Sequence, residues 1–133
     1  MMNALVIDDS GAIRQVARRI LETLDFEVSE ATDSDAAYDA CRRRAFDFIF
    51  LDLHTLGGVE FLAYQRSRSG GPQAKVLICT VDANDPDLNG ALRAGADDYM
   101  LKPFDREVLA GRLREIGVLQ PQGELAATAL VDA

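Results

Sequence analysis

Short apolar runs alternate with amphipathic helical segments along almost the whole chain, and this alternation restricts the fold more than any other feature. Five runs have the length and composition of buried strands, namely 4–7, 26–31, 46–53, 75–81 and 97–102. Apolar residues at helical spacing separate them, most clearly between Ile13 and Leu24. Repeated strand–helix units predict the α/β class, a doubly wound parallel sheet of five strands with helices on both faces.

Residues with strong capping and turn preferences mark the ends of the predicted helices. Ser10, Asp85 and Asp105 are expected N-caps, and Pro86 suits the first position of a helix that stops at Gly95. The expected helices therefore span about 13–24, 34–44, 59–68, 86–94 and 106–117.

The length of 133 residues suits a single domain, which we assign to residues 1–117. Residues 118–133 lie beyond the last full helix and are expected to form a C-terminal tail, either mobile or folded as a short docking helix. No apolar stretch has membrane-spanning length, and the N-terminus lacks a basic segment followed by an apolar one. A cytoplasmic protein without membrane insertion is expected.

Charge and cysteine usage exclude further classes. A net charge of -8 argues against a nucleic-acid partner, which would normally face a basic surface. The arginines at 18–19 and 42–44 fall in helical patterns, where solvated helix faces explain them better than a basic patch. Cys41 and Cys79 are too few and too far apart to indicate a disulfide scaffold or a zinc site.

Polar side chains follow four of the predicted strands at the point where each strand ends. Asp8 and Asp9 follow the first strand, Asp52 ends the third, Thr80 ends the fourth and Lys102 follows the fifth. Each residue alone has another explanation, such as a helix cap or a solvated side chain. Because the carboxyl ends of parallel strands meet at one edge of a sheet, their convergence favours a binding site there.

Three carboxylates without histidines or thiols suit a hard cation, and Mg²⁺ fits best because it takes few carboxylates and keeps several waters. The positive partner of Asp8 and Asp9 is therefore predicted to be Mg²⁺. Lys102 is one of only two lysines beside twelve arginines, so a compact point charge is indicated before Pro103. A cation, an ammonium and a threonine hydroxyl together can stabilise a phosphoryl group.

The four segments "IDDS", "FIFLDL", "LICT" and "GADDYMLKPF" carry a family resemblance. In order and spacing they resemble the receiver domain of bacterial two-component response regulators, the CheY-like family, from residue 3 to about 117. The resemblance implies a flavodoxin-like (βα)5 fold with strand order 2-1-3-4-5. It also implies a signalling phosphoacceptor rather than an enzyme.

The resemblance implies a role for each residue of the acidic cluster. Asp52 would accept the phosphoryl group from a phosphohistidine on a sensor histidine kinase or a histidine phosphotransfer protein. Asp9 would bind Mg²⁺ directly, and Asp8 mostly through water. The backbone carbonyl of His54 would be the third protein ligand beside Asp9 and Asp52.

The remaining residues of the pattern are implied to read the phosphorylated state. Lys102 would pair with the phosphoryl oxygens, and the peptide bond to Pro103 would be cis. Thr80 and Tyr99 would form the switch, in which the hydroxyl moves to the phosphoryl group and the ring turns inward. Because no effector domain follows in this sequence, the surface of residues 85–115 is expected to bind a downstream protein target.

The chain departs from the family pattern next to Asp52. The loop "LHTLGGVEF" lacks the usual Met-Pro pair and is about two residues short, and Gly57-Gly58 would let the shorter chain turn. This shortening leaves open the placement of the third ligand. The His54 side chain is either a partly exposed group or one that alters phosphoryl hydrolysis. Val81 is expected to crowd Asp52 or restrict Thr80, and Asp82 to be solvated.

Three classes of function follow from these residues. The first is a stand-alone phosphoacceptor switch, within which a chemotaxis regulator, a phosphorelay shuttle and a kinase modulator are open. The second is a small Mg²⁺-dependent phosphatase or transferase with Asp52 as nucleophile, but the chain has no spare residues for a cap domain. The third is a degenerate receiver that binds partners independently of phosphorylation.

Overall fold

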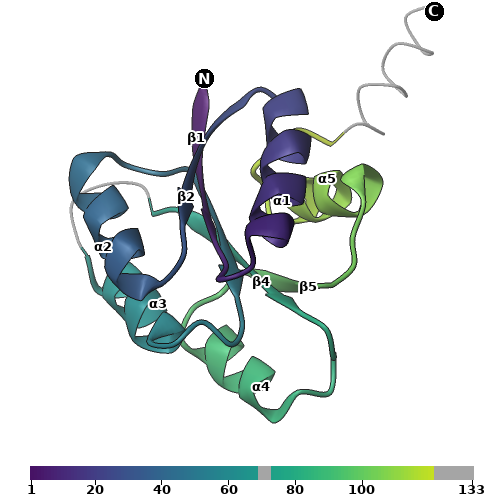
Figure 1. The fold of residues 1–133 in the computed structure, drawn as a ribbon. Coiled ribbons are helices and arrows are strands. Elements are labelled where there is room, and N and C mark those ends of the chain that lie inside the picture. The colour runs from purple at the N-terminus through teal and green to yellow at the C-terminus, as the bar shows by residue number, and fades with distance from the viewer. Residues whose placement is uncertain (69–72, 122–133) are drawn as a thin grey trace, which may run out of the picture.

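The computed structural model describes residues 1–68 and 73–121, which form a five-stranded parallel sheet flanked by helices (Figure 1). The sheet order is β2-β1-β3-β4-β5, so the predicted 2-1-3-4-5 topology and flavodoxin-like class are confirmed. The strands are β1 (Met2–Ile7), β2 (Phe26–Ala31), β3 (Phe48–Asp52), β4 (Lys75–Thr80) and β5 (Asp98–Leu101). The helices are α1 (Gly11–Thr23), α2 (Ser34–Arg43), α3 (Gly58–Ser67), α4 (Pro86–Arg93) and α5 (Arg106–Glu115).

Alternate residues of the central strands supply two separate hydrophobic cores. On β3, Phe48 and Phe50 join the core under α1 and α5, whereas Ile49 and Leu51 join the core under α2, α3 and α4. All four side chains are buried, which explains why this strand is apolar throughout instead of alternating with polar residues. Asp52, the next residue, is therefore delivered at the tip of a rigid strand between the two cores.

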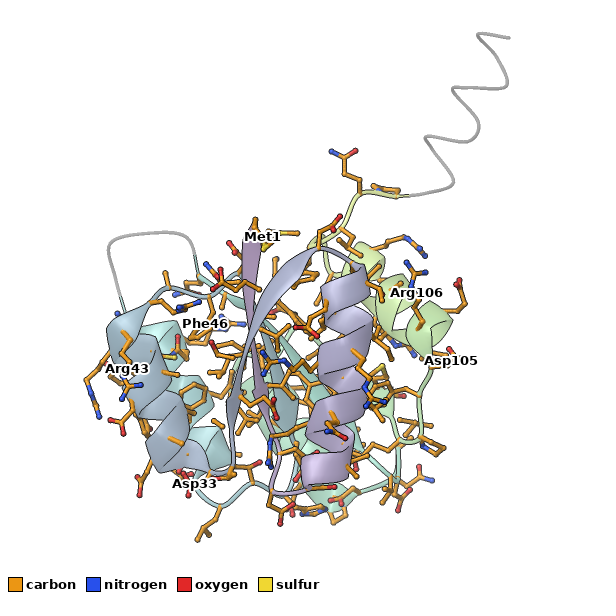
Figure 2. The ribbon with its side chains drawn as sticks, turned by 45° about the horizontal axis from the view of Figure 1, so that its top comes forward. Met1, Asp33, Arg43, Phe46, Asp105 and Arg106 are labelled. Carbon is orange, nitrogen blue, oxygen red and sulfur yellow. The ribbon has the colours of Figure 1, made fainter. Side chains whose placement is uncertain are left out.

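Side-chain caps fix the helix starts that the sequence predicts. The Ser10 hydroxyl accepts a hydrogen bond from the Ile13 amide at 3.3 Å, and Asp85 and Asp105 cap α4 and α5 in the same way. Asp33 caps α2, and Figure 2 shows Asp33 and Asp105 at the beginnings of their helices. These caps satisfy backbone donors that have no partner inside the helix.

The element boundaries differ from the predicted ones at a few positions. Strand β1 begins at Met2 instead of residue 4, because its pairing with β2 already starts there, opposite Phe26. Val118 and Leu119 donate backbone hydrogen bonds to the Leu113 carbonyl and pack against the core under α1 and α5. Most of the predicted tail, residues 122–133, lies outside the described residues.

No helix in the described ranges is long and apolar enough to cross a membrane.

Two glycines give a matched test of the backbone. A Cβ at Gly111, inside α5, would meet no atom within 4 Å, whereas Gly95 has a φ of +121° and its Cβ would lie 2.6 Å from Arg66 Cγ. We expect Gly111→Ala to raise the free energy of unfolding by about 1 kcal/mol, because alanine favours helix. Gly95→Ala should lower it by about 1–3 kcal/mol, because the conformation is strained for alanine. Urea unfolding measures both changes. If both variants changed the free energy of unfolding in the same direction, the backbone conformations described for Gly95 and Gly111 would be contradicted.

Candidate functional site

The carboxylates of Asp8, Asp9 and Asp52 come together at the carboxyl edge of the sheet. Asp8 and Asp9 directly follow β1, and Asp52 is the last residue of the neighbouring strand β3. One carboxylate oxygen from each residue lies within 4.8 Å of the other two. Asp8 is only 1% exposed, whereas Asp9 is exposed to solvent. The cluster is therefore partly buried and can be reached by an ion from the solvent. The structure therefore brings together the three acids that the sequence placed at strand ends.

Lys102 is the direct positive partner of two of these acids. Its Nζ donates to Asp8 Oδ2 and to Asp52 Oδ1, both at 2.7 Å, and its side chain is 13% exposed. Burial acts to lower the pKa of the ammonium, but the hydrogen bonds to Asp52 and Asp8 outweigh it, so the pKa of Lys102 lies above its usual value. The peptide bond to Pro103 is cis, as predicted.

The donor set fits a hard divalent cation. Asp8, Asp9 and Asp52 offer only carboxylate oxygens, and no histidine or thiol ligand joins this cluster among the described residues. Asp9 makes no side-chain hydrogen bond to any described residue, so its oxygens are available. A cation bound here would share Asp8 and Asp52 with the Lys102 ammonium. The sequence predicted the cluster and named Mg²⁺ as the positive partner of Asp8 and Asp9. In the structure, the Lys102 ammonium also pairs with Asp8.

Arg14 supports the cluster from behind, a role that the sequence did not indicate. Its guanidinium donates to the backbone carbonyl of Asp8 at 2.7 Å and to Glu30 Oε1 at 3.0 Å. Arg18 also donates to Glu30, at 2.8 Å. The hydrogen bond from Arg18 is the largest cause that keeps the pKa of Glu30 below its usual value. The turn after β1 is thereby fastened to the edge strand β2.

The two predicted switch residues lie on the adjacent strands β4 and β5. Thr80, 2% exposed, ends β4, and its hydroxyl accepts a hydrogen bond from the Asp82 amide at 3.3 Å. Tyr99 pairs with Ile78 in the β4–β5 register and packs, partly buried, against the core under α2, α3 and α4. Thr80 is thus connected to the segment that leads into α4, and the switching roles of both residues stay predictions.

The loop after Asp52 turns through a glycine, and the His54 side chain in this loop reaches Asp85 at the N-cap of α4. Gly57 has a φ of +75°, and a Cβ there would lie 2.8 Å from the Ser34 hydroxyl, so glycine is required. The His54 ring is bound to Asp85 at 2.7 Å through Nε2. Val81 is 73% exposed, and its predicted effect on Thr80 stays a prediction.

Lys102 and a bound cation compete for the same oxygens, which gives a measurable consequence. We expect Lys102→Met to raise the affinity for Mg²⁺ by about tenfold, because a positive charge that repels the cation and occupies its ligands is removed. Isothermal titration calorimetry measures the change. Lys75→Met is the matched control, since Lys75 lies at the start of β4 and pairs with Asp97. Unchanged or weaker Mg²⁺ binding in Lys102→Met would contradict this description.

The fold and the site together define an α/β domain that presents an acidic cation site beside an aspartate at a strand tip. The model of the response regulator receiver domain matches residues 4–114. The chain therefore belongs to the response regulator receiver family of two-component systems. Receivers are signalling phosphoacceptors that histidine kinases phosphorylate, and the Asp8, Asp9 and Asp52 cluster is typical of their magnesium site.

Solved structures and curated relatives agree with this assignment. The chemotaxis response regulator CheY4 of Vibrio cholerae superposes with a TM-score of 0.79 at 28% identity, covering 87% of this chain and 98% of that one. The phosphate regulon transcriptional regulatory protein PhoB of Escherichia coli (strain K12) is 31% identical over 114 residues, and KDP operon transcriptional regulatory protein KdpE is 36% identical over 116. These matches cover 84% and 86% of this chain but 50% of each relative, so the chain spans about half their length.

Proposed function

We propose that this receiver domain is a phosphorylation switch, in which Asp52 accepts a phosphoryl group from a phosphohistidine. The donor is a sensor histidine kinase or a histidine phosphotransfer protein, and the output is the binding of a downstream protein target. The observation that carries the proposal is the Lys102 ammonium, held 2.7 Å from both Asp8 and Asp52. An ammonium beside the nucleophile and the acidic cluster is suited to neutralise the charge on the phosphoryl oxygens that are transferred to Asp52.

In the proposed reaction, a carboxylate oxygen of Asp52 attacks the phosphorus of the phosphohistidine. A P–O bond forms as the P–N bond breaks, and the departing imidazole nitrogen keeps the electron pair and takes up a proton. Mg²⁺, held by Asp9, Asp52 and the His54 carbonyl with Asp8 acting through water, would supply charge neutralisation on the phosphoryl oxygens. Lys102 keeps its proton throughout and moves its hydrogen bond from the Asp52 carboxylate to a phosphoryl oxygen.

The proposed output follows from the position of Thr80 between the site and α4. Once Asp52 carries a phosphoryl group, the Thr80 hydroxyl gives up the Asp82 amide and donates to the new oxygens. The segment leading into α4 shifts with it, and the Tyr99 ring turns inward. The surface formed by α4, β5 and α5, on which Leu101 and Val108 are 43% and 44% exposed, then favours its target.

The test is incubation with Mg²⁺ and acetyl phosphate, followed by intact mass measurement. The proposal expects one added phosphoryl group per chain, and none when Mg²⁺ is chelated before the donor is added. Turnover of a phosphorylated substrate without a stable adduct would favour the phosphatase or transferase. Absence of any adduct would favour the degenerate binding module.

A further inference from the structure

His54 and Asp85 join two loops that flank the proposed phosphoacceptor. His54 lies two residues after Asp52, and Asp85 lies five residues after Thr80, at the N-cap of α4. The imidazole Nε2 lies 2.7 Å from Asp85 Oδ2. Within the described part of the chain, this is the one side-chain hydrogen bond between the 53–57 loop and the 81–85 loop.

The Asp85 carboxylate uses its two oxygens for two different purposes. Oδ1 accepts the Asp87 amide at 2.9 Å and caps α4, while Oδ2 binds His54. The side chain is 14% exposed, although that of His54 is 58% exposed. The carboxylate is therefore already fixed by the cap, so His54 docks on an ordered acceptor instead of ordering a free one.

Backbone hydrogen bonds hold the 53–57 loop, among them that from the Thr55 amide to the Asp52 carbonyl at 3.1 Å, but none of them reaches the 81–85 loop. The Leu53 amide donates to the Cys79 carbonyl at 2.9 Å, and the Gly58 amide donates to the Thr55 carbonyl at 2.9 Å, so the two ends are secured. Gly57 adopts a left-handed conformation, and its carbonyl accepts the Phe61 amide at 3.0 Å. An anchor at His54 restricts the backbone whose carbonyl is proposed to bind Mg²⁺.

We infer that Asp85 is a positioning residue for the magnesium site, acting through the His54 side chain on the backbone of the 53–57 loop. The inference rests on the proposed function, because it takes the His54 carbonyl as a ligand. Without the anchor, the loop must be ordered when the cation binds, and this ordering weakens binding.

The experiment compares His54→Ala, Asp85→Ser and the double variant. Serine retains a capping oxygen for α4 but is too short to reach His54. Calorimetric titration with Mg²⁺ should give an affinity about threefold lower in each single variant and no further loss in the double variant, as for one shared contact. His54→Gln, which retains a donor of similar reach, should recover most of the affinity.

Two further measurements separate positioning from charge and from a failed site. Asp87→Ser removes a neighbouring carboxylate, one that does not contact His54. This variant should therefore keep a Mg²⁺ affinity near the parent value. In metal-free protein, amide exchange of residues 54–58 should be about threefold faster in His54→Ala than in the parent.

The outcomes are distinguishable. A parent that binds Mg²⁺ with all variants unchanged, or a loss in Asp87→Ser equal to that in Asp85→Ser, overturns the positioning role alone. A parent that binds no Mg²⁺ at millimolar concentration overturns the proposed function and, with it, the positioning role.

Discussion

The Asp52→Asn variant should take up no phosphoryl group from acetyl phosphate, whereas the parent chain should gain one. An amide oxygen is a poor nucleophile, and a neutral amide is a weaker ligand for Mg²⁺ than a carboxylate, so we expect a loss of at least about a hundredfold in rate. The change is conservative in size and removes a charge from a side chain that lies at the rim of the sheet. Intact mass after fixed incubation times measures the uptake.

Asp47→Asn is the matched control for this experiment. Asp47 precedes the same strand at its opposite end, where its carboxylate accepts the Asn3 amide at 2.8 Å. This variant should be phosphorylated at the parent rate. Uptake of a phosphoryl group by Asp52→Asn at a comparable rate would mean that another side chain is the acceptor.

Phe50→Ala should lower the free energy of unfolding by about 3–5 kcal/mol. Phe50 is fully buried, and its ring lies 5.6 Å from the Phe104 ring at an interplanar angle of 54°. Truncation leaves a cavity under α1 and α5 and removes an aromatic contact to the segment that follows Lys102. Urea unfolding measures the loss, and the slope of the free energy of unfolding against urea concentration should not change.

Phe50→Leu provides the comparison, because it keeps most of the apolar volume and should cost about 1–2 kcal/mol. A loss below about 1 kcal/mol in Phe50→Ala would contradict the tight packing described for this core. A loss of the expected size with unaltered Mg²⁺ binding would show that the core and the carboxylate cluster are energetically separate.

Much of the fold could be predicted from local patterns. The strand-like runs and the caps at Ser10, Asp85 and Asp105 each depend on a few consecutive residues, and a parallel sheet follows from their alternation. The meeting of Asp8, Asp9 and Asp52 was also accessible, because carboxyl ends of parallel strands share one edge. The strand order needed the family resemblance, since alternation alone permits several orders.

Pairs formed between distant side chains could not be predicted in this way. His54 and Asp85 are 31 residues apart, and nothing in either neighbourhood specifies the other. Arg14 lies in an ordinary amphipathic helix, and only the packing of α1 beside β2 directs it to Asp8 and Glu30. The contact of Lys102 with two carboxylates likewise depends on where β5 ends along the strand direction relative to β1 and β3.

The bridging lysine has a consequence for which ions the pocket prefers. When ionised, Asp8, Asp9 and Asp52 carry three negative charges, and the single ammonium leaves a residual charge of minus two. A doubly charged ion brings the net charge of the pocket to zero. Sodium or potassium leaves the pocket with a net negative charge, and a lanthanide gives it a net positive charge. The internal counter-ion therefore favours a divalent over a monovalent ion by charge, in addition to the oxygen donors and the coordination number that suit Mg²⁺.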